Sequence, residues 1–394
     1  MAYHEWLAAL LVACSLHRTG ALPKTVTFDE VAPHLLQRAP IRIGVAQYAK
    51  AVKALPTGRG VVVFEKDGER SSLPLPAGRP ILARPDGDRI VIESPQGEVR
   101  CSKATVRAPG KCVRVYSWGA QTRSGVYGGE VEIALDPHGS LSAINVLPLE
   151  SYLVGVVAAE VPVYFHSEAL KAQAIIARTY ALFNLGKHER QGFDLCDGVH
   201  CQQYRGHVNI TRVRAAVTET KGCVLTYNGC LAETVYHAVC GGFVDDPYRV
   251  WDGYLMPYLR ATADAPRGAK SISSAEPTEP QVVQFLAEQS SYYCARSPRY
   301  RWRRTYAAAE MQRLLDANLR VLTGDEEPPG RLIEMKTDGR SPGGRVQTLH
   351  ITTDRGEYDV KRNDIRWIFG DGKPGPNGLP STLLCLHTKR DDTG

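Results

Sequence analysis

At Pro148-Leu-Glu-Ser-Tyr-Leu-Val-Gly-Val-Val-Ala-Ala-Glu-Val-Pro162 the sequence turns from strand-like to helical patterning. Apolar residues recur at helical spacing from Leu149 to Glu160, and the leading proline suits a first helical turn. The closing Val-Pro pair stops this pattern because proline cannot continue a helix. A second segment, rich in alanine and leucine, runs from Ser167, a good N-cap residue, to about Leu185. The sequence therefore predicts two adjacent helices.

Short strand-like runs precede this stretch and are separated by Gly and Pro. They are Ile41–Val45, Val61–Phe64, Arg89–Glu93, Val113–Tyr116 and Glu130–Ala134. Runs of this length with closely spaced turn signals predict a β-rich region up to about residue 147. After the two helices, Asn228-Gly229 separates the runs Cys223–Tyr227 and Cys230–Tyr236, and this dipeptide is the strongest short-range signal for a hairpin.

These patterns predict an α+β protein with a β-rich N-terminal region followed by a mixed α/β core that contains the two adjacent helices and hairpins. The expected divisions are a leader at 1–40, a β-rich region at 41–147, a core at 148–265 and a C-terminal α+β region at 266–394 that completes the fold. Within the last region we expect a Pro/Ser-rich loop at 266–280, a helix at about 307–319 and a hairpin at 346–369 turned at 354–356.

Composition indicates an ordinary globular protein and excludes several classes. The 394 residues include 48 Lys and Arg against 42 Asp and Glu, so the formal net charge is +6. Because the excess is spread along the chain and forms no long Lys/Arg block, nucleic acid is not indicated as a partner. The chain also lacks the zinc-protease motif and the phosphate-binding loop.

The N-terminus carries a weak export signal. An apolar run from Trp6 to Leu16 is typical of a signal-peptide core and is too short to cross a bilayer. The residues Leu11-Val-Ala-Cys14 are similar to a lipoprotein cleavage site, but no Lys or Arg precedes them and Glu5 stands where positive charge is expected. We expect a location in the cell envelope outside the cytoplasm, in the periplasm or on the outer face of the membrane. Lipidation at Cys14 stays open.

Glu160 is the first candidate for chemistry. It ends the apolar stripe of the first helix, where partial burial and the negative end of the helix dipole both raise the pKa of a carboxyl group. A raised pKa suits a general acid, although an ordinary surface glutamate near a helix end has the same pattern. On the second helix, Lys171 and Arg178 lie two turns apart on one face, which suits either a groove for a polar or anionic polymer or a solvated surface.

The segment Cys196-Asp-Gly-Val-His200-Cys201 is a candidate metal site. Two Cys and one His within six positions can supply three zinc ligands, with a fourth from His188, His237 or Cys240. A Cys196–Cys201 disulfide in an exported protein is an equal alternative. A second disulfide is expected to close the Cys101–Cys112 loop in an exported protein, whereas Cys223 and Cys230 lie too far apart on their hairpin to pair.

Several linked stretches, in order, resemble the stage II sporulation protein D family, also called SpoIID/LytB. They are the run Leu147–Pro162, the run Ser167–Tyr180, the run Cys196–Tyr204, the run Tyr236–Gly242, Trp251, the run Pro257–Arg260 and the run Leu379–Thr382. The resemblance is most specific over about residues 147–265. It implies a lytic transglycosylase that cuts the β-1,4 bond between N-acetylmuramic acid (MurNAc) and N-acetylglucosamine (GlcNAc) in peptide-free peptidoglycan strands and leaves 1,6-anhydro-MurNAc ends.

The same resemblance assigns roles to individual residues. It implies that Glu160 is the single catalytic acid/base, because the 6-hydroxyl of the substrate replaces the second carboxylate that a glycosidase needs. It places Ser167, Lys171, Arg178, Gln202 and Tyr204 in the glycan-binding groove. Some relatives bind zinc at the position of Cys196, His200 and Cys201, where the metal is expected to be structural, with no other cofactor. The alternative is a non-catalytic protein that binds glycan and enhances a cell-wall amidase.

Overall fold

The computed structural model describes residues 24–27, 40–119, 122–251, 255–266, 276–288, 292–324, 327–372 and 377–389. The chain forms two compact units, Met1–Tyr236 and His237–Gly394, so the range predicted for the core, 148–265, crosses this division. Cys14, the apolar run at 6–16 and most of the loop predicted at 266–280 lie outside the described residues. Among the described residues, no helix combines the length and apolar character needed to cross a bilayer.

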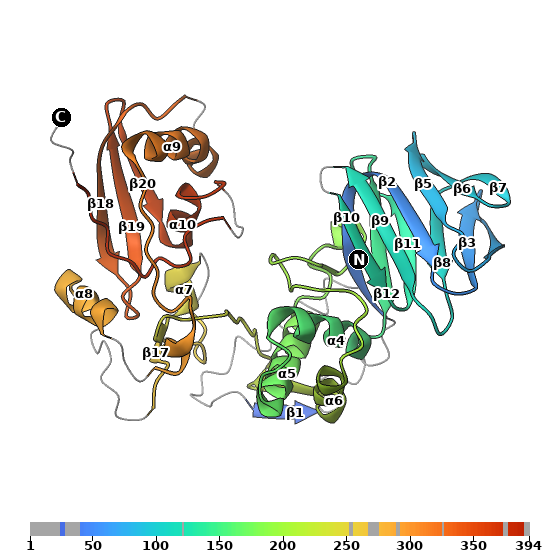
Figure 1. Cartoon of the computed structure of the whole chain (residues 1–394), viewed down its shortest axis with the longest axis horizontal. Helices are drawn as coiled ribbons and strands as arrows, with labels where there is room; N and C mark the ends of the chain where they lie inside the picture. The colour runs from blue at the N-terminus through green and yellow to red at the C-terminus, as the bar shows by residue number, and fades with distance from the viewer. Residues whose placement is uncertain are drawn as a thin grey trace. The chain divides into compact units, whose positions relative to one another are not determined.

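A large, mostly antiparallel sheet dominates the first unit, drawn in blue to green in Figure 1. Its strands are β2 (Ile41–Pro56), β3 (Gly60–Lys66), β4 (Glu69–Leu75), β5 (Ile81–Asp86), β6 (Arg89–Ser94), β7 (Gly97–Cys101), β8 (Lys103–Arg107), β9 (Val113–Gly119), β10 (Arg123–Tyr127), β11 (Glu130–Leu135), β12 (Leu141–Leu147) and the short β13 (Leu195–Cys196). The order is β4-β3-β8-β11-β12-β2-β5-β6-β7, and the long strand β2 also pairs with β9 and β13. Each predicted strand run lies in one of these strands, which confirms the β-rich N-terminal region.

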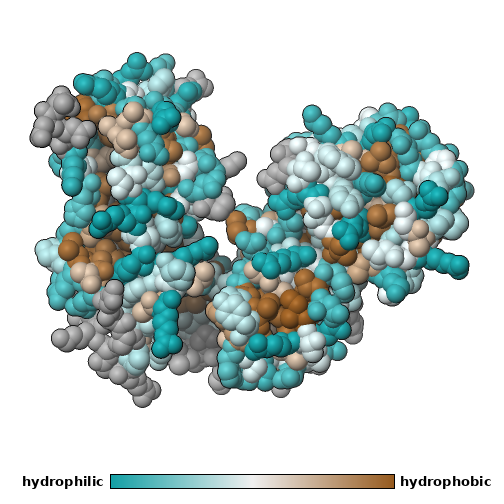
Figure 2. Space-filling view, in the orientation of Figure 1, coloured by the Kyte–Doolittle hydropathy of each residue, from teal (hydrophilic) through white to brown (hydrophobic). Residues whose placement is uncertain are grey.

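The two predicted helices are confirmed as α4 (Leu149–Glu160) and α5 (Ser167–Phe183). The N-cap of α5 is His166 rather than Ser167, because the His166 ring accepts the hydrogen bond from the backbone N–H of Glu168. A third helix, α6 (Thr211–Glu219), packs against both. The helices and the sheet share one apolar core, which contains Leu153 and Val156 of α4. Figure 2 shows partly apolar surface over the part of this unit that contains α4 and α5.

The predicted hairpin is confirmed in β14 (Cys223–Tyr227) and β15 (Cys230–Leu231), although its second strand is shorter than expected. Asn228 and Gly229 both have positive φ, the combination that a type I′ turn requires, and Tyr227 faces Cys230. The strand β1 (Lys24–Thr27) pairs with β14 on its other side. Cys223 is a free thiol, so it does not pair with Cys230.

The disulfide expected between Cys101 and Cys112 is wrong, because both are free thiols. Cys101 is fully buried at the end of β7, where its register partner is Ile90. Cys112 directly precedes β9, and its backbone is tied instead to Thr57: Thr57 N–H and its hydroxyl both donate to the Cys112 carbonyl. The two cysteines are therefore held by different strand pairs.

The second unit has two small apolar cores. Its elements are β16 (Phe243–Val244), α7 (Pro247–Val250), β17 (Thr262–Ala263), α8 (Glu279–Ala287), the 3-10 turn η2 (Tyr293–Arg296), α9 (Ala308–Thr323), β18 (Leu332–Arg340), β19 (Val346–Thr353), β20 (Glu357–Lys361), the 3-10 turn η3 (Arg362–Asp364) and α10 (Ile365–Ile368). Apolar side chains of α9 and α10 pack on the three-stranded sheet β18-β19-β20, which Figure 1 shows in orange. The predicted helix and hairpin are confirmed, but the helix ends at Thr323, four residues later than expected.

Candidate functional site

Glu160 is the last residue of α4 and is partly buried. Its Oε1 atom accepts a hydrogen bond of 2.6 Å from the backbone N–H of Gln203, and its carboxyl group is also hydrogen-bonded to the side chain of Tyr236. Burial raises the pKa of Glu160, while the hydrogen bonds from Gln203 and Tyr236 oppose this shift. The raised pKa that the sequence predicts is therefore confirmed in direction.

A chain of side-chain hydrogen bonds runs from the core to Glu160. The hydroxyl of Tyr152, fully buried, donates to Gln202 Oε1 over 3.2 Å, and Gln202 Nε2 donates to the Tyr236 hydroxyl oxygen over 3.0 Å. Because the Tyr236 oxygen accepts from Gln202, its own proton is available for the Glu160 carboxyl group. Gln202 is itself fully buried and also donates to the Ala177 carbonyl over 3.3 Å. This network fixes the direction in which Tyr236 donates.

A cluster of two Cys and two His lies beside this network. His188, Cys196, His200 and Cys201 each offer one ligand atom, and the four atoms lie within 4.8 Å of one another. His188 Nε2 lies 3.2 Å from His200 Nδ1 and 3.4 Å from Cys201 Sγ. His200 Nδ1 lies 3.6 Å from Cys201 Sγ and 3.8 Å from Cys196 Sγ. In a tetrahedral zinc site with two Cys and two His, neighbouring ligand atoms lie about 3.3–3.8 Å apart, so these residues fit such a metal.

The surroundings of the cluster also suit a metal site. The Nδ1 atom of His188 is hydrogen-bonded to Gln191 Oε1, which places the proton on Nδ1 and leaves Nε2 free to act as a ligand. The ring of His188 stacks on Phe193 at 4.9 Å between centroids. Hydrogen bonds from the Cys201 thiol and the Gly198 N–H lower the pKa of Cys196, so one thiolate is already favoured. Both thiols are free, so the structure does not contain a Cys196–Cys201 disulfide.

Arg178 does not lie on a groove surface. Its side chain is 1% exposed, and its Nε and Nη2 atoms bind both carboxylate oxygens of Glu150 at 2.8 and 2.7 Å. Further donation to the carbonyls of Cys223 and Val217 ties α5 to β14 and α6. The placement in a glycan groove therefore needs correction: a guanidinium this buried packs the helices together and cannot reach a polymer in solvent.

The other residues expected in the groove divide between surface and core. Ser167 is exposed at the start of α5. One turn later, the ammonium group of Lys171 forms ion pairs with Glu168 at 2.9 Å and Glu219 at 2.8 Å. Tyr204 is buried: its ring lies 5.0 Å from that of Tyr152, between centroids, and its hydroxyl donates to Asn145 over 2.8 Å. Ser167 and Lys171 are thus accessible from solvent, whereas Tyr204 supports the loop from within.

Residues 137–227 match the family model described as Stage II sporulation protein, SpoIID. The chain carries a SpoIID domain. Residues 246–393 match a model described only as a domain of unknown function, DUF8618. The chain is 27% identical over 244 residues to Stage II sporulation protein D of Bacillus subtilis, which covers 58% of this chain and 59% of that protein.

Two further relatives match shorter parts of the chain. The chain is 37% identical over 112 residues to the Amidase enhancer of Bacillus subtilis, which covers 28% of this chain and 15% of that protein. It is 34% identical over 122 residues to an uncharacterized protein of Brachyspira hyodysenteriae, which covers 30% of this chain and 33% of that protein. The chain thus spans less than two thirds of the length of each of these relatives.

The SpoIID domain contains one of the three residues considered for a fourth ligand. His188 lies in the cluster with Cys196, His200 and Cys201. His237 and Cys240 belong to the second unit, and Cys240 lies there with Asp264 and Cys294. His188 is the candidate nearest to Cys196 in the sequence, so spacing alone could have favoured it. The sequence does not show, however, that the 3-10 turn at 189–191 brings the His188 ring back to Cys196.

Three contributors to the SpoIID site were missed from the sequence. The backbone N–H of Gln203 binds Glu160, and a backbone donor leaves no signal in a side-chain pattern. Tyr236 binds Glu160 across 76 positions of the chain, which no local pattern can predict. Gly155 of α4 has no room for a Cβ atom, because such an atom would collide with the Tyr204 ring and the Gly206 carbonyl. This glycine lets the 201–206 loop approach the helix that ends in Glu160.

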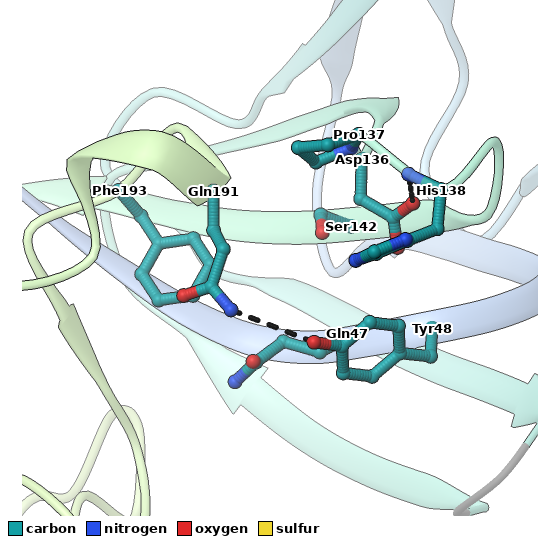
Figure 3. Close-up of a pocket in the computed structure, with 8 residues that line it drawn as sticks. All are labelled: Gln47, Tyr48, Asp136, Pro137, His138, Ser142, Gln191 and Phe193. Carbon is teal, nitrogen blue, oxygen red and sulfur yellow. Dashed lines mark hydrogen bonds between the residues drawn. The ribbon is translucent and has the colours of Figure 1, made fainter.

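A separate hollow lies next to the Cys/His cluster. The two share Gln191 and Phe193, which contact the His188 ring and also line the hollow. Its lining consists of Gln47, Tyr48, Asp136, Pro137, His138, Ser142, Gln191 and Phe193, as Figure 3 shows. The side-chain amide of Gln191 donates to the Tyr48 hydroxyl over 3.5 Å, while the other end of the same amide binds the His188 ring. The predicted site residues do not line this hollow, so we do not count it as part of the candidate site.

Proposed function

We propose that this chain is a cell-wall lytic transglycosylase that cleaves the β-1,4 MurNAc–GlcNAc bond of peptide-free peptidoglycan strands, with Glu160 as the general acid/base. The observation that carries the proposal is the setting of Glu160: a partly buried carboxyl group with a raised pKa, held by the Gln203 N–H and by Tyr236. A raised pKa widens the pH range in which a carboxyl group carries a proton that it can give to a leaving oxygen.

One carboxyl group suffices for this reaction. Glu160 protonates the glycosidic oxygen, the C1–O bond breaks, and the 6-hydroxyl of the same MurNAc bonds to C1. The hydroxyl proton then passes to the Glu160 carboxylate, so the acid is restored and a 1,6-anhydro end remains. The donors on Glu160 stabilise the carboxylate between these two proton transfers. A hydrolase would instead need a second carboxylate to activate water or to attack the sugar.

Zinc is the metal that the His188, Cys196, His200 and Cys201 set fits best, because four soft or borderline ligands in a closed tetrahedron are typical of structural zinc. Its effect on Glu160 would be indirect. Cys201 is followed at once by Gln202, which orients Tyr236, and by Gln203, whose N–H binds Glu160. A metal that holds Cys201 would therefore fix both donors of the acid.

The substrate and location follow from the same proposal. Ser167 and Lys171 are the solvent-accessible polar residues of α5 that the resemblance assigns to glycan binding. Lys171 lies between two glutamates, so it would contact sugar hydroxyls or an N-acetyl group rather than act as a free cation. Peptidoglycan lies outside the cytoplasm, so we propose an extracytoplasmic envelope location.

The test is mass spectrometry of peptide-free glycan strands incubated with the purified chain, with Glu160→Gln and Glu93→Gln. Glu93 pairs with Arg84 on the surface of the sheet, so E93Q is a matched loss of one carboxylate. Anhydro-ended fragments from the wild type and E93Q, with none from E160Q, are the expected result. Intact strands in all three samples would refute the enzymatic proposal. Fragments with reducing ends would indicate hydrolysis, which needs a second carboxylate. Glu233 would then be the next residue to replace, because its charge and that of Glu160 both act on Tyr180.

A second function is favoured by the match to the Amidase enhancer. In this alternative the chain binds glycan and stimulates a cell-wall amidase without cutting the strand. The E160Q protein separates the two: it should still stimulate amidase release of peptides if the chain is an enhancer. A lytic enzyme should lose its effect on the glycan with this substitution.

A further inference from the structure

The second unit holds a separate cluster of two cysteines and a carboxylate. Cys240, Asp264 and Cys294 each offer one ligand atom, and these atoms lie within 4.8 Å of one another. Cys240 Sγ lies 3.2 Å from Asp264 Oδ2 and 3.4 Å from Cys294 Sγ. Cys240 is 5% exposed, whereas Asp264 and Cys294 are half-buried, so the cluster is open to solvent on one side.

The backbone already holds the three groups in place. Asp264 directly follows β17, and its N–H donates to the Gly242 carbonyl over 3.0 Å. The carbonyl of Asp264 accepts from the Tyr293 N–H over 2.9 Å, which brings η2 and Cys294 to the same point. Gly241 and Gly242 both have positive φ, and this turn lets the Gly242 N–H donate to Cys240 Sγ over 3.3 Å. Burial raises the pKa of the Cys240 thiol, and this N–H bond acts against that shift.

The cluster can supply negative charge to a cation. All three groups are anionic when deprotonated, and the Cys240 thiol hydrogen-bonds to the Asp264 carboxylate. Two arginines lie nearby, but Arg345 donates to the Cys240 carbonyl oxygen and Arg301 to the Gly241 carbonyl oxygen, not to sulfur. A divalent cation would replace the thiol protons and neutralise the carboxylate together.

A metal accounts for the geometry better than a disulfide. Around tetrahedral zinc, two sulfur ligands lie about 3.8 Å apart, and a sulfur and an oxygen ligand about 3.5 Å apart, close to the observed 3.4 and 3.2 Å. A disulfide needs its two sulfur atoms about 2.05 Å apart. A Cys240–Cys294 disulfide would also remove the thiol proton that Cys240 donates to the Asp264 carboxylate. Hard cations such as magnesium avoid thiolates, so zinc suits the set best.

We propose that Cys240, Asp264 and Cys294 form a second zinc site, in the second unit and independent of the Cys/His cluster of the SpoIID domain. Three protein ligands leave a fourth position for water or a further ligand. The site joins the β16–β17 strand pair to η2 at the edge of a small core, made of Phe243, Val282, Phe285, Tyr292, Tyr300 and Leu383. A core of this size gains stability from a metal that cross-links its segments.

The test measures bound zinc per chain in the whole 394-residue chain. The purified protein is reduced, stripped of metal, loaded with Zn²⁺, passed through a desalting column and analysed by inductively coupled plasma mass spectrometry. Cys240→Ala/Cys294→Ala should lose one equivalent of zinc relative to the wild type. Cys385→Ser, which changes another half-buried thiol of the same unit, should lose none. The readout is a difference, so it holds whether or not the SpoIID cluster binds zinc.

A second variant guards against misfolding. Asp264→Asn keeps both thiols and the shape of the side chain, and it should weaken zinc binding at the site by at least about tenfold. With Co²⁺ as the probe, the wild type should show thiolate-to-cobalt charge transfer that falls in C240A/C294A and persists in C385S. Zinc content in C240A/C294A equal to that of C385S would overturn the proposal. Peptide mapping that finds Cys240 and Cys294 joined in a disulfide in the zinc-loaded protein would overturn it as well.

Discussion

Arg178 provides the sharpest separation between packing and substrate binding in the SpoIID domain. Arg178→Met removes a guanidinium that is 1% exposed, and with it the ion pair to Glu150 and the hydrogen bonds to the carbonyls of Cys223 and Val217. Glu150 then keeps only a long hydrogen bond of 3.5 Å from the Gly222 N–H among the described contacts. Breaking a buried ion pair from one side costs about 3–5 kcal/mol. The Glu150 side chain is 29% exposed and can regain some water, so we expect the low end, about 3 kcal/mol. For a domain of this size such a loss lowers the unfolding temperature by about 6–12 °C.

The assay is thermal and urea unfolding of the full chain, followed by circular dichroism, beside glycan cleavage at a temperature where each variant is folded. Lys171→Met is the matched control, because it removes a cation from the same helix. The ion pairs of Lys171 with Glu168 and Glu219 lie at the surface, so their loss should cost little stability. We expect K171M to unfold close to the wild-type temperature. The double variant R178M/E150Q should recover part of the stability lost in R178M, because it no longer leaves an unpaired carboxylate.

One pattern would refute this reasoning. If R178M unfolds at the wild-type temperature and loses glycan cleavage, the guanidinium acts on substrate and does not hold α5 to its neighbours. If R178M is destabilised but cleaves normally at low temperature, the packing role stands alone. The double variant then tests whether the cost comes from the carboxylate left behind.

Three further predictions concern Glu160 and its supports. Cleavage should fall as pH rises through the raised pKa of Glu160, because the acid form is then lost. Tyr236→Phe removes a hydrogen-bond donor to the carboxylate and so raises this pKa further. The fall in kcat/KM with rising pH should therefore occur at higher pH in Y236F than in the wild type. His188→Ala should release one equivalent of zinc and lower cleavage, as measured by metal analysis and strand digestion. Gly155→Ala places a methyl group against the 204–206 loop, so it should cost about 1–3 kcal/mol in urea unfolding and reduce cleavage even where the protein is folded.

Local patterns predicted the elements that hold the site but not the contacts that complete it. The apolar residues from Leu149 to Glu160 predicted α4 correctly, although this helix is buried around most of its circumference and not on one face alone. The Asn228-Gly229 turn was predicted correctly because its backbone requires positive φ. In both cases the physical cause lies within a few residues of the signal.

The roles on α5 show the limit of such patterns. Lys171 and Arg178 project from one face at a spacing of two turns, and the sequence cannot distinguish a solvated face from one covered by other elements. The structure buries Arg178 under α6 and β14 but leaves Lys171 near the surface. Burial of an arginine depends on Glu150, 28 positions earlier, and on carbonyl groups that carry no sequence signal. The two cations therefore have different environments despite their common face.

Consecutive residues in one loop connect the metal ligands to the acid. Cys201 belongs to the Cys/His cluster, Gln202 orients the Tyr236 hydroxyl, and the Gln203 N–H binds Glu160. A shift of the loop by an ångström would lengthen the Gln203 bond and turn Gln202 away from Tyr236 at the same time. Loss of either donor raises the pKa of Glu160 further, so metal removal should change the pH profile of cleavage as well as its rate. A metal that only stabilised the fold would lower the amount of active protein and leave the profile unchanged.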